Sequence, residues 1–186
     1  MLRKCPAGYY PEVSDKAFID PTAIVCGRVI IEDNVFVGPY AVIRADEVDA
    51  SGDMQPVLIK QGSNLQDGVV IHSKAGAEVI VGERTSIAHR SIVHGPCTVG
   101  DDVFIGFNSV VFRCHIGDGS VIRHNAVVEG VDLPERSHVP PMTAIAHESD
   151  LASVEKVSPE FSSFSESVVS ANHVLVEGYK ELGDEL

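Results

Sequence analysis

The stretch VGERTSIAHRSIVHGPCTVGDDVFI, residues 81–105, repeats with a period of six residues. A helix would repeat every 3.6 residues and a lone strand every two, so neither explains this pattern. A period of six fits a short strand plus a corner, and three such units form a triangular coil of about eighteen residues. One large aliphatic and one small side chain of each unit would then point inward. The large positions are Val81, Ile87, Val93, Val99 and Ile105.

The same period extends in both directions from this stretch. It runs upstream from Ile19 to Ile43, breaks between Val48 and Val57, and slips by four residues before Val81. About seventeen units in total predict between five and six stacked coils, which are stable only together because no single coil buries enough apolar surface. The remaining large positions are Ile19, Val25, Ile31, Val37, Ile43, Ile59, Leu65, Ile71, Val111, Ile116, Ile122 and Val128.

The C-terminal part of the chain has a different pattern. We expect Pro134, Pro140 and Pro141 to end the repeat. From about residue 161, apolar residues recur with the spacing of one helical face, which predicts an amphipathic helix packed back against the coils. The chain therefore divides into a β-helix domain with an N-terminal extension, residues 1–148, and a helical segment, residues 149–186. The helical stripe comprises Phe161, Phe164, Val168, Leu175 and Tyr179, with Ala171 and Asn172 between them.

The composition describes a folded, acidic chain. Of the 186 residues, 44% are hydrophobic, and the formal net charge is −13. Such a negative charge disfavours binding to nucleic acid or to an anionic membrane surface. No apolar run is long enough to span a bilayer, and the N-terminus has no secretory signal. We expect a cytoplasmic protein with four reduced cysteines, and we interpret the retention-like ending GDEL, residues 183–186, as chance.

Three histidines are candidates for a metal site. His72 and His89 are nearly one coil apart, so we expect them at almost the same azimuth on adjacent layers. His94 follows five residues after His89, and five extended residues span roughly 16 Å. Ligand nitrogens lie only about 2.1 Å from a shared ion, so His89 and His94 of one chain are too far apart to share it. Two ligands from one chain and one from a neighbour would form an interfacial site. The alternative is three separate histidines, each hydrogen-bonded at the surface.

Several segments resemble the gamma-class carbonic anhydrases. They are RADE at 44–47, NLQDGVVIH at 64–72, IAHRSIVHGP at 87–96, VGDDVFIG at 99–106, and EGYK at 177–180. The wider pattern resembles the hexapeptide-transferase superfamily, which implies a left-handed parallel β-helix with a C-terminal α-helix. The carbonic anhydrase resemblance covers nearly the whole chain. It implies a homotrimer that hydrates carbon dioxide reversibly to bicarbonate at metal sites between subunits.

The resemblance also implies the ligands of the metal ion. His72 and His94 would come from one subunit and His89 from the next, which agrees with the distance argument. Three neutral imidazoles leave one position for water and leave the charge of the ion unneutralised. The ion would be Zn²⁺, although Fe²⁺ or Co²⁺ would accept the same ligands.

Further roles follow from the same resemblance. Gln66 would hydrogen-bond the attacking water, and Asn64 would orient that network. Arg44 would pair across the trimer interface with Asp67 and touch the bicarbonate region. On the residues alone, Arg44 and Asp67 could instead serve only assembly, and Gln66 could merely cap a coil edge.

Three more polar residues complete the implied site. Asp46 would support the interface, Glu47 would relay protons, and Asn172 would contact bicarbonate. A solvated loop charge is the alternative reading of Glu47. For Asn172, which lies on the apolar stripe of the predicted helix, the alternative is a structural amide with a hydrogen-bond partner.

Two features depart from the best-studied archaeal type. An acidic loop with a proton-shuttle glutamate is missing after His72, where residues 73–77 read SKAGA. Ser170 replaces a tyrosine beside the bicarbonate asparagine. Both changes affect the route of proton transfer and leave the histidines intact, so we expect turnover to depend on buffer.

Two other functions remain open from the sequence. The first is a non-catalytic trimeric scaffold or assembly protein that keeps the metal for stability. The second is an acyltransferase acting with coenzyme A, a common task of this fold, although fold alone is weak evidence for function.

Overall fold

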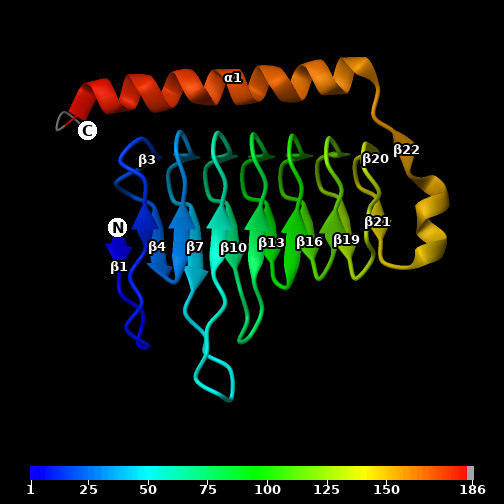
Figure 1. Ribbon diagram of the computed structural model, residues 1–186. Coiled ribbons are helices and arrows are strands. Elements are labelled where there is room, and N and C mark those ends of the chain that lie inside the picture. Colours follow the sequence, from blue (N-terminus) through cyan, green and yellow to red (C-terminus); the bar gives the residue numbers. More distant parts are fainter. Residues whose placement is uncertain (184–186) are drawn as a thin grey trace.

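The chain folds into a parallel β-solenoid of about seven turns, followed by a long helix that runs beside it (Figure 1). The computed structural model describes residues 1–183, so most of the GDEL ending lies outside the described residues. Three sheets form the sides of the solenoid, and through most of the chain every third strand belongs to the same sheet. This architecture confirms the predicted β-helix with its C-terminal helix.

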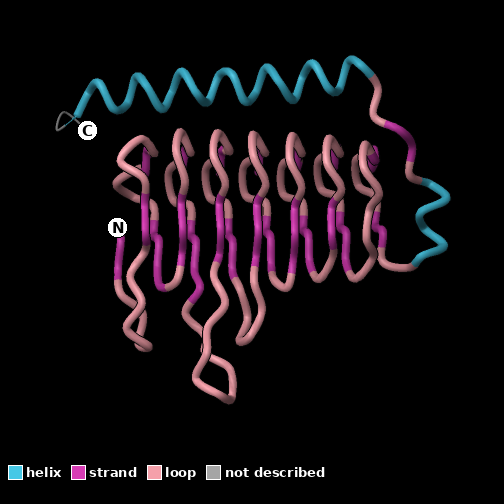
Figure 2. Tube along the Cα trace, in the orientation of Figure 1, coloured by secondary structure: helices cyan, strands magenta, loops and turns pink. Residues whose placement is uncertain are grey.

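The short strands stack coil on coil in all three sheets, with loops at the corners between them (Figure 2). Sheet A contains β1 (Leu2–Arg3), β4 (Ile24–Gly27), β7 (Val42–Ala45), β10 (Val70–His72), β13 (Ile92–His94), β16 (Val110–Phe112), β19 (Val127–Glu129) and β21 (Ala144–Ile145). Sheet B contains β2 (Glu12–Val13), β5 (Val29–Ile31), β8 (Val57–Ile59), β11 (Val79–Val81), β14 (Cys97–Val99) and β17 (His115–Ile116). Sheet C contains β3 (Phe18–Ile19), β6 (Phe36–Val37), β9 (Asn64–Leu65), β12 (Ser86–Ile87), β15 (Phe104–Ile105), β18 (Val121–Ile122), β20 (Ser137–Val139) and β22 (Glu155–Lys156).

The interior consists of stacked columns of the predicted large residues. In sheet A, for example, Ile43, Ile71 and Val93 lie in direct register and are fully buried. The small inward positions that carry a hydroxyl donate it to a carbonyl of the next coil, as Thr85 does to Gly100 at 2.7 Å. The core therefore tolerates serine and threonine because each hydroxyl has a partner.

The predicted number of coils was too low, and the prolines do not end the repeat. β20 and β21 follow Pro134 and form a further coil. The prolines lie between strands, where a missing N–H costs no ladder bond. At the other end, β1 and β2 lie before the first residue of the predicted pattern.

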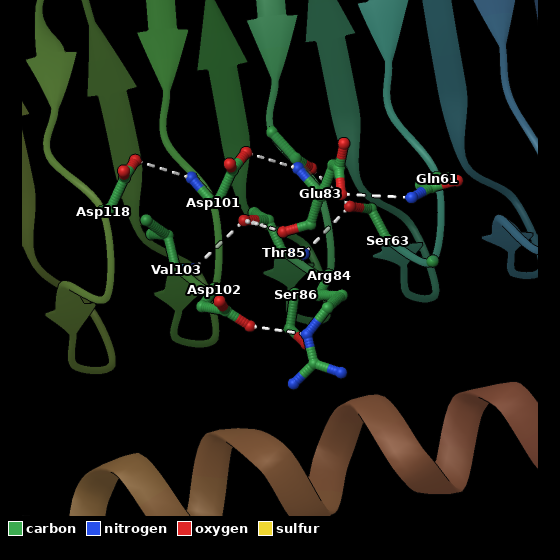
Figure 3. Close-up of polar contacts among 12 residues, drawn as sticks. Gln61, Ser63, Glu83, Arg84, Thr85, Ser86, Asp101, Asp102, Val103 and Asp118 are labelled. Atoms are coloured by element: carbon green, nitrogen blue, oxygen red, sulfur yellow. Dashed lines mark hydrogen bonds and ion pairs between the residues drawn. The ribbon is translucent and has the colours of Figure 1, made fainter.

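The corner between sheets B and C carries a ladder of side chains along the stack (Figure 3). The Asp118 carboxylate accepts the backbone N–H of Asp101, whose own carboxylate accepts the N–H of Glu83. These bonds pair backbone donors that the turns leave free. Nearby, Arg84 donates to Asp102 at 2.8 Å beside the helix.

The predicted C-terminal helix is α1 (Pro159–Leu182), preceded by the 3₁₀ helix η1 (Glu148–Ser153). Ser158 caps α1 by accepting the N–H of Phe161. Helix α1 lies along the outer side of sheet C, where Tyr179 stacks on Phe18 with ring centroids 4.7 Å apart. No helix within residues 1–183 is long and apolar enough to cross a membrane.

The buried face of α1 is rotated relative to the predicted stripe. Its buried residues are Ser165, Val169, Asn172 and Val176. Phe164 and Leu175, which we assigned to the packed stripe, are 44% and 42% exposed. We predicted the packed face of the helix from its apolar residues alone. The column of sheet C under α1 includes Asn64 and Ser86, so small and polar helix residues fit against it.

Gly27 provides a test of how closely the coils approach one another. Its φ is +85°, and an added Cβ would collide with the carbonyl oxygen of Ala45 on the next coil. Gly52 has nearly the same φ, +87°, but has open space around its Cβ position. Both alanine variants carry backbone strain of about 1–2 kcal/mol. Gly27→Ala should lower the free energy of unfolding by about 1–3 kcal/mol more than Gly52→Ala, because of the added collision.

Urea unfolding followed by circular dichroism measures both variants against the wild type. Equal unfolding midpoints for the two variants would show that the contact between coils at Gly27 is loose.

Candidate functional site

His72 and His94 lie directly above one another in sheet A. They are paired in register at the ends of β10 and β13, twenty-two residues apart in the chain. Our expectation that His72 and His89 share an azimuth was therefore wrong. Four extra residues between β10 and β11 lengthen this coil, and His89 lies in the corner that follows β12 in sheet C.

The two imidazole rings have the spacing that a shared metal ion needs. Nδ1 of His72 lies 3.2 Å from Nε2 of His94, and two nitrogens bound to one tetrahedral ion are roughly 3.4 Å apart. The other nitrogen of each ring faces an acceptor: Asp46 Oδ1 lies 3.3 Å from His72 Nε2, and the Gly95 carbonyl lies 3.0 Å from His94 Nδ1. Such outer contacts fix the tautomer and orientation of metal-binding histidines. These residues therefore fit a metal ion.

Charged side chains surround His72. The guanidinium of Arg44 lies 3.3 Å from His72 Nε2, and its Nε lies 3.6 Å from Asp46. Glu47 Oε1 lies 3.6 Å from the same imidazole nitrogen, and Oε2 accepts the backbone N–H of Ala75 at 3.1 Å. The short loop after His72 thus holds Glu47 beside the histidine. We name this group the β10–β13 cluster; it comprises Arg44, Asp46, Glu47, His72 and His94.

The remaining predicted site residues of the β-helix form a second group at the opposite end of the sheet A strands. Asp67 Oδ2 lies 3.5 Å from His89 Nδ1, and both side chains are about half exposed. Gln66 donates to Asn64 at 3.1 Å, and Asn64 donates to Ser86 at 2.7 Å, in a buried chain of polar groups. We name this group the corner cluster; it comprises Asn64, Gln66, Asp67 and His89.

One chain does not bring the three histidines together. β13 separates His89 from His94, and within residues 1–183 no group of three or more histidine, cysteine or acidic side chains could hold a metal ion. Arg44 likewise pairs with Asp46 within the chain, and the predicted contact between Arg44 and Asp67 is not made inside one subunit. A complete site would need a second chain.

The outer face of sheet A lies between the two clusters and is apolar. A column of aliphatic residues in register covers it, and Ile92 at its centre is 38% exposed. A continuous apolar column on a surface marks a site of association. The column comprises Ile24, Val42, Val70, Ile92, Val110 and Val127.

Asn172 lies on the buried face of α1 and is 7% exposed. Its Nδ2 donates to the Val168 carbonyl of the same helix at 2.9 Å. Within the described part of the chain, the amide therefore already has the structural partner that the alternative reading requires. No hydrogen bond between described residues connects it to either cluster.

A groove of about 360 Å³ lies between α1 and the corner of sheets B and C. It contains none of the predicted site residues. Its charged lining residues are Arg84, Asp102, Asp118, Glu135, Arg136 and Glu166, an excess of acids over bases. Phosphate-containing ligands such as coenzyme A would be repelled there.

Sequence reasoning missed Ser86, whose hydroxyl accepts a hydrogen bond from Asn64 of the corner cluster. Its contact with Asn64 could be predicted only from the strand register, because the two residues pair across coils that are not of equal length. Ser86 directly precedes Ile87, whose side chain points inward. The side chain of Ser86 therefore lies on the outer side of the sheet, under α1.

Comparisons with known proteins place this chain in a group of hexapeptide-repeat proteins. The family described as "Bacterial transferase hexapeptide (six repeats)" matches residues 10–45 and 78–113. A carbonic anhydrase of Methanosarcina thermophila is 35% identical over an alignment covering 92% of this chain and 75% of that protein. The carboxysome assembly protein CcmM of a Nostoc species is 33% identical over 90% of this chain, which spans 31% of that longer protein.

Two further comparisons extend this group. The carnitine operon protein CaiE of Escherichia coli K12 is 36% identical over 68% of this chain and 58% of its own length. The crystal structure of a hexapeptide transferase family protein from Anaplasma phagocytophilum superposes with a TM-score of 0.80 at 23% identity, over 96% of this chain and 98% of that one. This structural likeness shows the fold alone.

The buried polar chain from Ser86 to Gln66 can be tested by removing one hydroxyl. Ser86→Ala would leave the Asn64 amide without its acceptor, because both residues are fully buried. We expect the free energy of unfolding to fall by about 1–3 kcal/mol, the usual cost of an unsatisfied buried donor. Chemical denaturation measures the loss, and Ser167→Ala on the exposed side of α1 is the control. Unchanged stability of Ser86→Ala would mean that another acceptor replaces the hydroxyl.

Proposed function

The chain belongs to the bacterial transferase hexapeptide family, and within this family we propose that it is a gamma-class carbonic anhydrase that works as a homotrimer. The observation that carries the proposal is the 3.2 Å separation of His72 Nδ1 and His94 Nε2, with the third histidine held apart on the corner cluster. The 35% identity to a carbonic anhydrase over nearly the whole chain supports the same reading.

The two clusters fit a ring of subunits. In a closed ring each subunit uses two different surfaces, one for each neighbour. The β10–β13 cluster of one subunit would meet the corner cluster of the next, and the apolar face of sheet A would be buried between them. His89 would then join His72 and His94 of the neighbouring subunit, and Asp67 would come within reach of its Arg44.

His72, His94 and the neighbouring subunit's copy of His89 would hold a zinc, iron(II) or cobalt ion, which would supply Lewis-acid activation of water near neutral pH. The chain's own residues would orient the reactants. Asp46 Oδ1 lies 3.3 Å from His72 Nε2, and a His72 tautomer that carries its proton on Nε2 would donate to this carboxylate and leave Nδ1 free to bind the ion. Gln66 donates through Nε2 to Asn64, which leaves Oε1 free to accept a hydrogen bond from the attacking water. Arg44 offers a positive charge to the bicarbonate that forms.

Glu47 would receive the proton that hydration releases. Its side chain is 48% exposed and its carboxylate lies beside His72, so it touches both the site and the solvent. Proton transfer to buffer would then complete the reaction, in which carbon dioxide and water give bicarbonate and one proton. Because the acidic loop is absent, exchange with buffer would limit the rate.

Asn172 keeps its proposed contact with bicarbonate. Its amide would first have to exchange the present bond to the Val168 carbonyl.

A second candidate function is that of a non-catalytic assembly protein. The 33% identity to a carboxysome assembly protein over 90% of this chain favours it. Such a protein would share the trimer and the metal but would not turn over carbon dioxide. Acyl transfer is less well supported, because acyltransferases of this fold generally use one catalytic histidine and a cofactor groove between subunits, and three histidines with this spacing fit that arrangement poorly.

Stopped-flow hydration of carbon dioxide tests the proposal directly. Protein loaded anaerobically with iron(II), or with zinc, should accelerate hydration in strong buffer, and His89→Ala should lower the rate by at least about 100-fold, because one ligand is lost. The matched control is His115→Ala, which removes an exposed histidine outside both clusters. A trimer that binds metal but shows no rate above His89→Ala would instead support the assembly function.

Mixed trimers test whether the site lies between subunits. His72→Ala and His89→Ala should each be inactive alone, since each removes one ligand. Co-expressed in equal amounts, they should recover about one quarter of the wild-type metal content and rate, because about one interface in four then combines two intact surfaces. No recovery in verified mixed trimers would place all the ligands within one chain.

A further inference from the structure

Each of two proposed ligands has a phenylalanine one coil above it. Phe107 follows His89, and Phe112 follows His94, by about one coil of eighteen residues. Both pairs of ring centroids are 5.3 Å apart, tilted in the first pair and edge-on in the second. Phe107 and Phe112 are thus separated along the chain by the same number of residues as His89 and His94, and they lie on the next coil.

The two histidines differ in how firmly they are held. His94 has a 3.0 Å contact with the Gly95 carbonyl and a 3.2 Å contact with His72. His89 is half exposed, and in the described part of the chain its ring contacts the Asp67 carboxylate at 3.5 Å and packs against the ring of Phe107. The ring of Phe107 therefore limits how the imidazole of this half-exposed histidine can turn.

Phe107 is fixed from its other side by His124. The two rings stack with centroids 4.3 Å apart and planes 14° apart. His124 Nδ1 also accepts the backbone N–H of Phe107 at 3.0 Å. Burial, and secondarily the charge of Arg123, lower the pKa of His124, which keeps this acceptor nitrogen unprotonated. Asp67, His89, Phe107 and His124 therefore form one continuous stack over four coils.

Folding alone does not account for this aromatic ring. Phe107 is 39% exposed at a corner where polar turn residues are common, so a large part of this aromatic ring faces solvent without being packed in the core. It lines a shallow recess of about 430 Å³ together with Asp67, His89, Arg90 and Asn108. The exposed ring borders the surface that a neighbouring subunit would cover.

We propose that Phe107, held by His124, is a positioning residue that orients the imidazole of His89 toward a metal ion shared with the neighbouring subunit. The proposal rests on the metal site described above and does not depend on the reaction. Residues that orient metal ligands act through ligand geometry, and their loss weakens metal binding without removing a ligand.

Zinc affinity, measured by competition with a chromophoric chelator, tests this role without reference to turnover. Phe107→Ala should bind zinc about 10- to 100-fold more weakly than the wild type. Phe107→Tyr keeps the ring and should bind as the wild type does. His124→Ala should fall between them, because the ring of Phe107 remains but loses its support. Tyr10→Ala, which removes an exposed aromatic ring outside both clusters, is the control.

Two further readouts separate positioning from general damage. In the metal-free protein, the His89 ring signals in NMR spectra should shift in Phe107→Ala, while those of His94 stay in place. The urea midpoint should change no more than that of Tyr10→Ala.

Equal zinc affinity of Phe107→Ala and Phe107→Tyr would overturn the proposal, as would an affinity loss that came with unchanged His89 signals. A wild type that binds no zinc would overturn the metal site and this role together. Zinc binding without hydration would reject the proposed reaction and leave the positioning role to be decided by the variants.

Discussion

The backbone ladder between successive coils is the constraint on which this structure depends. Each strand donates to and accepts from the strand one coil away, so all coils must keep the same register. Extra residues can be accommodated only between strands, because a slip within a strand would turn its inward side chains outward. The long segment between β7 and β8 and the four extra residues between β10 and β11 are both accommodated in this way. The slip leaves His72 in register with His94, and this pairing brings two ring nitrogens within 3.2 Å.

Much of the fold could be predicted from the sequence because its signal is repeated many times. The inward columns around Ile71 and Val93 follow directly from the six-residue period. Coils with weak signals were missed: β20 and β21 lie among prolines, and β1 and β2 contain only two residues each. The face of α1 was misjudged because apolar character does not reveal that the opposing column is partly polar.

The candidate site was predictable in part, for a related reason. Counting residues along an ideal coil placed His72 beside His89, whereas the real coil is longer and pairs His72 with His94. The distance between His89 and His94 depends on the short local segment between them, which is the corner at residues 90–91 and β13, so the inference that one chain cannot join them remains consistent with the structure. Contacts across coils, such as Ser86 with Asn64 or Phe107 with His124, depend on the register of several layers at once. No local sequence pattern contains that information.

The position of α1 ties the length of the helix to the number of coils. Its 24 residues span about 36 Å at a rise of 1.5 Å per residue. Seven coils stacked at about 4.8 Å occupy nearly the same length, and Figure 1 shows the helix running beside the whole stack. The length of α1 therefore matches the height of the stack of coils. Duplication or deletion of one coil would leave the internal packing intact. It would, however, move Tyr179 or Phe161 away from the ring on which it stacks, unless about three helical residues changed with it. Lineages that gain or lose a coil should therefore show a matched change of nearly one helical turn in this segment.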